Sequence, residues 1–190
     1  LVASMAMMAA APVAARRFGP FAVIAVGLTM GAVGFALLTQ LGTDSVPLVT
    51  VAVLVLNGGL GMAMSVAVDG ILASVPPARA GAGASVSETA NELGIALGTA
   101  LLGSIMTAVY RSRMELLDAV PDDALRRARE TLGAAIVASE ELSGTAGAAL
   151  ESGARSAFVE GVHTAAIVAS AATFVVAVWA AVTRLRDGGD

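Results

Sequence analysis

The sequence predicts an all-α, polytopic membrane helix bundle, and three observations carry this prediction. Of the 190 residues, 57% are apolar and only 14% are charged, whereas ordinary soluble domains carry about 25% charged residues. The mean hydropathy is +0.83. The apolar residues are gathered in runs of about 20, which is the length that crosses the hydrocarbon core of a bilayer as a helix.

The expected spans follow one another with short connections. The run 1–15 is expected to be the end of a crossing whose start is missing, because it opens on Leu and is shorter than a full span. We therefore interpret the chain as the C-terminal piece of something longer. Complete spans are expected at 21–41, 48–74, 84–110 and 165–183, with an extracellular helical segment at 111–164 and a cytoplasmic tail at 184–190.

The connections contain residues that begin and end helices. A Pro/Gly loop is expected over 75–83. In the segment before the last span, Pro121 followed by two aspartates predicts the start of a helix that continues to Ile136. A break is expected at 143–147, and a second helix, 148–162, should run on into the last span.

The placement of arginines predicts the orientation. Arg16 and Arg17, then Arg79, then the C-terminal tail fall on one side if each span crosses once, and the short turn with Asp44 falls on the other. Arginine marks cytoplasmic connections, so the first side is expected to be cytoplasmic. The long 111–164 segment would then lie outside, although it carries six arginines beside nine acids.

Composition also limits the chemistry. The chain has no Cys and one His, which excludes disulfides, thiolate sites and a metal cluster built on His. Its formal charge of −4 argues against a nucleic-acid partner. We expect no enzymatic activity and neither a metal nor a bound cofactor.

The span 84–110 carries a polar stripe. At about 100° per residue, Glu88, Glu92 and Thr99 share one narrow arc with Ser85. Such a stripe usually faces a water-filled path, because ionisable groups that face lipid are costly. The alternative is that Ser85-x-x-Glu88 is a capping box at the helix start and that both acids lie near the headgroups.

The preceding span presents Gly58 and Asp69 on one arc, with Asn57 and Gly61 beside it. Glycines allow a neighbouring helix or a substrate to come close, but Asp69 could equally be an interfacial residue. The residues proposed for a transport path are therefore Asn57, Asp69, Glu88, Glu92 and Thr99. The residues proposed for helix packing are Gly27, Gly31, Gly58, Gly61, Gly94 and Gly98.

Three motifs resemble the fourteen-helix drug:proton antiporters of the major facilitator superfamily. Pro77…Ala80-Gly81…Ser85, then Glu88-Thr89 and Glu92-Leu93-Gly94…Gly98, is similar to the penultimate helix of that family. Asn57-Gly58-Gly59-x-Gly61 resembles the helix before it. Arg16-Arg17-Phe18-Gly19-Pro20 resembles a degenerate form of the superfamily's basic cytoplasmic loop without its acidic residue. The long outer segment is similar to the branch that exports antiseptics and other lipophilic cations.

The resemblance implies that the chain is the last part of a C-terminal major facilitator bundle. The whole protein would be a proton-coupled secondary transporter of the plasma membrane, which exports drugs or lipophilic compounds by alternating access. The implied partners are the lipid bilayer, the missing N-terminal part of the same chain, and small lipophilic substrates, cations among them. A proton gradient would supply the energy. The family's best-known coupling acids lie in the absent part.

Two alternatives stay open. One is a narrow-specificity exporter of a single lipid or natural product. The other is a non-transporting membrane scaffold, whose glycine faces would drive assembly alone. The polar stripe favours a transporter, because a scaffold needs small residues but not Glu92 and Thr99.

Overall fold

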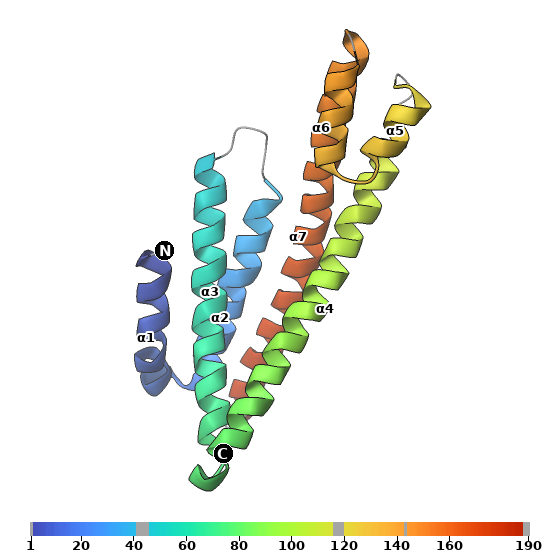
Figure 1. Cartoon of the computed structure of the whole chain (residues 1–190). Coiled ribbons are helices and arrows are strands. Elements are labelled where there is room, and N and C mark those ends of the chain that lie inside the picture. Colours follow the sequence, from blue (N-terminus) through green and yellow to red (C-terminus); the bar gives the residue numbers. More distant parts are fainter. Residues whose placement is uncertain (1, 41–45, 116–119, 143, 188–190) are drawn as a thin grey trace. The chain divides into compact units, whose positions relative to one another are not determined.

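The structure is a computed structural model that describes residues 2–40, 46–115, 120–142 and 144–187. Every regular element in these residues is a helix (Figure 1). The elements are α1 (Val2–Phe18), α2 (Pro20–Leu38), α3 (Val46–Ala73), the short 3₁₀ turn η1 (Pro77–Arg79), α4 (Ala80–Met114), α5 (Asp122–Ala128), α6 (Leu132–Glu141) and α7 (Thr145–Asp187).

Four stretches among the described residues are long and apolar enough to cross a membrane: Pro20–Leu38, Pro47–Ala73, Pro77–Met114 and Thr145–Thr183. This confirms the predicted polytopic membrane helix bundle. α4 has 35 residues and α7 has 43, well beyond the roughly 20 that a crossing needs. The expected spans 84–110 and 165–183 therefore lie inside longer helices, and their membrane boundaries stay predictions.

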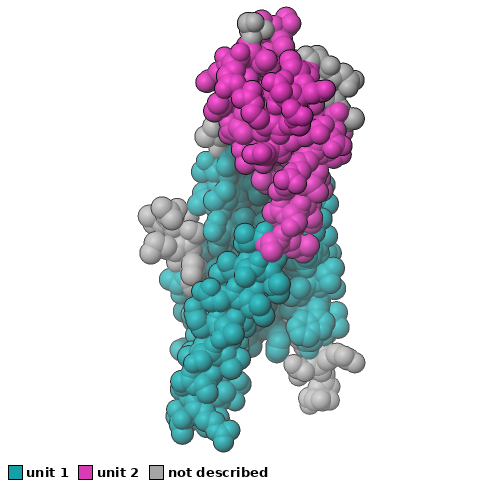
Figure 2. All heavy atoms as spheres, turned by 45° about the vertical axis from the view of Figure 1, so that its right-hand side comes forward, with its two compact units in different colours: residues 1–99, 166–190 teal, residues 100–165 magenta. Residues whose placement is uncertain are grey.

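The chain divides into two compact units, coloured separately in Figure 2. Unit 1 contains residues 1–99 and 166–190, and unit 2 contains residues 100–165. α4 and α7 each contribute residues to both units, because the divisions fall within these helices.

Unit 1 is built on close packing between α2 and α3. A Cβ atom added to Gly27 would lie 2.6 Å from the carbonyl oxygen of Gly59, and one added to Gly34 would lie 2.7 Å from the Cα of Leu56. Gly31 faces Leu60 at similarly short range. Small residues are what membrane helices need at such interfaces, because packing and not hydrophobicity holds helices together in lipid.

α1 and α7 complete unit 1. Ala11 of α1, Val23 of α2 and Val66 of α3 form a buried apolar cluster. The Ser170 hydroxyl of α7 donates a hydrogen bond of 2.9 Å to the carbonyl oxygen of Ala32. The last part of α7 leaves large apolar side chains exposed, and Trp179 among them is 65% exposed, which suits a surface that contacts lipid.

Unit 2 has a core of its own. Tyr110 and Met114 of α4 pack with α5, α6 and the first part of α7, where Leu150 is fully buried. The Tyr110 hydroxyl donates a 2.8 Å hydrogen bond to the carbonyl oxygen of Ala128 at the end of α5. At the unit's surface, Arg113 pairs with Glu160, and Arg127 pairs with Glu141 at 2.7 Å.

The structure corrects the expected helix that runs from Pro121 to Ile136. Pro121 precedes α5, which ends at Ala128. A new helix, α6, begins after Thr131, whose side chain accepts a 3.1 Å hydrogen bond from the backbone N–H of Ala134. This side-chain cap lets a second helix start in a different direction, so the apolar periodicity across both helices was misleading.

The expected loop over 75–83 is also corrected. α4 already begins at Ala80, so Gly81 and Gly83 are helical and the reversal of the chain is confined to η1 and its flanking residues. A Cβ atom on Gly83 would lie 2.8 Å from a methyl group of Val75. Gly83 therefore serves as a point of close approach and not as a helix breaker. A break was also expected at 143–147. Ser143 lies outside the described residues, and Gly144 has φ +73°. α7 then runs continuously from Thr145.

Candidate functional site

The polar stripe lies well inside α4 and not at its start. The Ser85 hydroxyl donates a 3.0 Å hydrogen bond to the carbonyl oxygen of Gly81, one turn earlier in the same helix. Because α4 begins at Ala80, Ser85 is not a capping residue. The proposed capping box with Glu88 is therefore wrong.

The acids of the stripe are uncovered by the described residues. Glu88, Glu92 and Thr99 are all exposed. Within the apolar 18-residue stretch of Pro77–Met114, only 6% is buried, compared with 33% for the corresponding stretch of α2. Because ionisable groups are costly against hydrocarbon, this face of α4 is suited to contact with water or with further polar protein surface.

Gly94 and Gly98 differ from the glycines of α2. A Cβ atom on either residue would find no atom within 4 Å among the described residues. None of the described helices therefore packs closely on these two glycines, and their predicted packing role concerns a neighbour outside the described residues. On α3, Gly58 does meet a neighbour, since its added Cβ would lie 2.8 Å from the Met7 sulfur, whereas Gly61 is half-buried.

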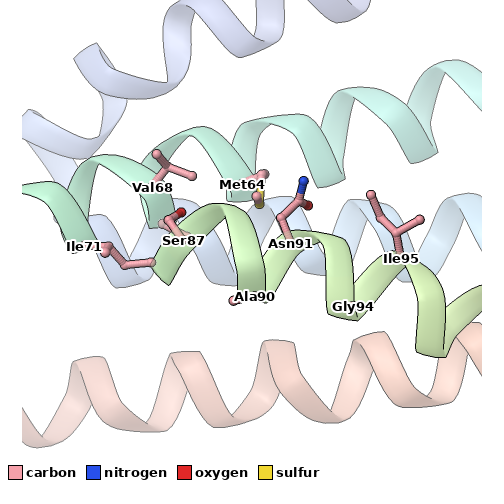
Figure 3. A pocket seen from close by; sticks show the side chains of 9 residues that line it. Met64, Val68, Ile71, Ser87, Ala90, Asn91, Gly94 and Ile95 are labelled. Carbon is pink, nitrogen blue, oxygen red and sulfur yellow. The ribbon is translucent and has the colours of Figure 1, made fainter. Parts of the chain in front are cut away.

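A groove of about 430 Å³ lies between α3 and α4, within unit 1 (Figure 3). We name it the α3–α4 groove. Its walls are mainly apolar and contain one hydroxyl and one carboxamide. The lining residues are Met64, Ala67, Val68, Ile71, Ser87, Ala90, Asn91, Gly94 and Ile95.

The two polar residues of this groove were missed by the sequence analysis. At about 100° per residue, Ser87 and Asn91 lie about 140° and 100° around α4 from Glu92, so they belong to another face. Ionisable side chains carried the predicted transport path, and these two neutral side chains were passed over. A detectable signal existed, because Ser87, Asn91, Gly94 and Gly98 recur at the spacing of one helix face.

A second groove, of about 550 Å³, lies between α1 and α3. It brings together Arg16, predicted as part of a basic loop, and Asp69, predicted as part of a transport path. Both are exposed, and opposite charges that border one groove attract each other. Arg17 instead lies over the ring of Phe18, with 5.5 Å between the guanidinium carbon and the ring centroid.

Asn57 is not part of either groove. Its side-chain amide donates a 2.9 Å hydrogen bond to the carbonyl oxygen of Val53 in its own helix. The predicted path residues are thus distributed over separate surfaces: Asp69 in the α1–α3 groove, the α4 stripe on an uncovered face, and Asn57 on α3. Within the described residues, no group of three or more His, Asp or Glu side chains is placed to hold a metal ion.

The helices and their composition define the class of protein: this is a multi-pass protein of the cell membrane. No protein-family profile matches the chain. The chain is 37% identical over 170 residues to the multidrug efflux pump LfrA of Mycolicibacterium smegmatis. The alignment covers 89% of this chain and 34% of LfrA, so the chain spans about a third of the length of this relative.

Proposed function

We propose that this chain is the C-terminal part of a proton-coupled exporter of drugs or other lipophilic compounds, in the fourteen-helix drug:proton antiporter family of the major facilitator superfamily. The observation that carries the proposal is the 37% identity to a multidrug efflux pump across 89% of the chain. The rest of the exporter, as an N-terminal bundle, would be its main protein partner.

The exposed stripe of α4 supports a partner of this kind. Glu88, Glu92 and Thr99 lie on a spanning helix that the described residues leave almost uncovered. An N-terminal bundle that met this face across a water-filled path would solvate the acids. In such a carrier, the two bundles rock about a central site and expose it to either side in turn.

The α1–α3 groove supports a conformational role for its two charges. Arg16 and Asp69 border the groove from different helices. Attraction between them would favour one relative position of the ends of α1 and α3.

The substrates are proposed to be small lipophilic compounds, cations among them, and the energy source is proposed to be the proton gradient. The scaffold alternative has weaker support, because the α2–α3 glycines are already occupied within the chain and a scaffold has no use for the α4 acids. A narrow exporter of one lipid or natural product would have the same architecture, so substrate range separates it from a multidrug exporter.

Reconstitution into liposomes tests the proposal. The longer carrier that contains this chain should move a fluorescent lipophilic cation against its gradient when a proton gradient is imposed, and an uncoupler should abolish the movement. The 190-residue chain alone should give none, because too few helices are present for two bundles. Transport that ignores the uncoupler would exclude proton coupling, and transport by the chain alone would exclude the need for a second bundle.

A further inference from the structure

The α3–α4 groove contains a polar side chain that has no hydrogen-bond partner among the described residues. Ser87 is only 8% exposed, and its hydroxyl makes no hydrogen bond with any described residue. By contrast, the hydroxyls of Ser85 and Ser104 each donate to a carbonyl oxygen one turn earlier in α4. The Ser87 hydroxyl is therefore left available to a ligand in the groove.

A second polar group faces the same space. Asn91 lies one turn after Ser87, and both side chains extend from α4 toward α3 (Figure 3). The Asn91 carboxamide also makes no hydrogen bond with the described residues, whereas the carboxamide of Asn57 is engaged by its own helix. Two adjacent donors thus converge on one groove, which is the arrangement that orients a small ligand in an apolar site.

The lining indicates an uncharged ligand. None of the nine residues around the groove is ionisable. A cation or anion bound there would lose its hydration without gaining an opposite charge, which is unfavourable in a membrane. The hydroxyl and the carboxamide each donate and accept hydrogen bonds, and as donors they match an oxygen acceptor, such as a ketone, ester or amide carbonyl.

The dimensions indicate a compact ligand. The volume of about 430 Å³ lies within the range of roughly 300–1,000 Å³ that small-molecule sites occupy. From Met64 to Ile71 the groove follows α3 for about 10 Å, which is less than the roughly 15 Å depth of one leaflet of hydrocarbon. A full lipid chain would extend beyond it. Met64 provides an adaptable apolar wall.

We propose that the α3–α4 groove is a binding site for a compact, neutral, lipophilic molecule that carries a carbonyl oxygen. The Ser87 hydroxyl and the Asn91 amide donate hydrogen bonds to that oxygen. Val68, Ile71 and Ile95 hold the apolar body. The site depends on the groove alone, so it stands or falls separately from the proposed transport.

Photolabelling with benzophenone, a neutral aromatic ketone that inserts into nearby C–H bonds on illumination, tests the site directly. The 190-residue chain in lipid nanodiscs is illuminated with the probe, and attachment sites are mapped by peptide mass spectrometry. We expect labelling to concentrate on 64–71 and 87–95. Ser87→Ala and Asn91→Ala should each lower it about fivefold, the effect of losing one hydrogen bond. The matched control is Ser104→Ala, which removes a hydroxyl already bonded to the Ala100 carbonyl oxygen and should leave labelling unchanged.

Competition on the unchanged chain keeps the test valid if a variant folds poorly. Excess dicyclohexyl ketone, which is neutral, should suppress the labelling, and tetraphenylphosphonium, which is a cation, should not. Labelling spread over all exposed apolar surfaces, or equal suppression by the cation, would overturn the proposal. No proton gradient is applied, so a failure of transport leaves the result unaffected, and a failure of labelling leaves the proposed exporter unaffected.

Discussion

Gly27 of α2 and Gly59 of α3 face each other so closely that a Cβ atom on either would lie 2.6 Å from the carbonyl oxygen of the other. The two backbones are in direct contact at this point. Gly94 and Gly98 of α4 have the same four-residue spacing as Gly27 and Gly31 but meet no described atom within 4 Å. The same sequence pattern therefore serves packing within the chain on α2, whereas on α4 it meets none of the described residues.

The first prediction compares these two glycine pairs in the isolated chain. Gly27→Leu should destabilise the fold by about 2 kcal/mol or more, because backbone atoms cannot yield as flexible side chains do. Gly98→Leu should have little effect there. Thermal unfolding in detergent, followed by circular dichroism, measures both. In the proposed longer carrier, Gly98→Leu should lower the amount of folded protein if another helix packs on it, and an unchanged amount would indicate that this face contacts lipid.

The second prediction concerns the acids of α4 and α3. Glu92→Gln and Asp69→Asn remove a charge while keeping size and hydrogen bonding. If the charge balances a cationic substrate, each variant should lose transport of a divalent lipophilic cation more than that of a monovalent one. The measurement is transport by the longer carrier in vesicles with an imposed proton gradient, normalised to protein amount.

The control for this experiment is Glu130→Gln, which removes an exposed acid in unit 2. Its transport of both cations should stay at the level of the unchanged carrier. Equal retention of both cations by Glu92→Gln and Asp69→Asn would assign these acids to interfacial structure and not to substrate or proton binding.

The third prediction concerns the link between α4 and α5. Tyr110→Phe removes only the hydroxyl that donates to the Ala128 carbonyl oxygen, so it should cost about 1 kcal/mol and act locally. Amide hydrogen exchange should become faster in α5. Arg155→Ala breaks an exposed pair within α7, at 2.8 Å from Glu151, and should change exchange little because such pairs contribute little stability. Equal amide hydrogen exchange in α5 with and without the Tyr110 hydroxyl would contradict a role of this hydroxyl in linking α4 to α5.

The fourth prediction concerns orientation. The chain has no Cys, so Ala78→Cys and Glu140→Cys provide single labelling sites at two exposed positions. An impermeant thiol reagent applied to intact cells should label position 140 and not position 78, because the arginines near the short connections mark the cytoplasmic side. Position 78 should react only after the membrane is opened. The reverse pattern would invert the topology.

The spanning helices could be predicted because lipid imposes one requirement on all of them. Backbone groups must be bonded within the segment, so long apolar runs become helices. The ends of the helices were harder to predict. Gly81 and Gly83 are typical of loops in water, but membrane helices accept glycine readily, and α4 includes both. The division between α5 and α6 depends on a cap at Thr131 that apolar periodicity does not reveal.

The surfaces were less predictable than the helices. A side chain that faces lipid is as apolar as one that faces a neighbouring helix, so the sequence alone does not separate Gly27 from Gly98. The shared groove of Arg16 and Asp69 joins residues about fifty positions apart and depends on the packing of α1 on α3. Ser87 and Asn91 recur with Gly94 and Gly98 on one helix face, but the absence of hydrogen-bond partners for their side chains becomes visible only when the neighbouring residues are known.

Trp179 gives the molecule a built-in optical probe. It is the only tryptophan in the sequence, and it projects from the apolar surface of α7 with 65% of its area exposed. Its fluorescence therefore comes from a single known position, without competing indoles. Quenching by lipids brominated at successive carbons along their acyl chains would report the immersion depth of α7 in the unaltered polypeptide, and any vertical displacement of that helix would appear as a change in the most effective quencher.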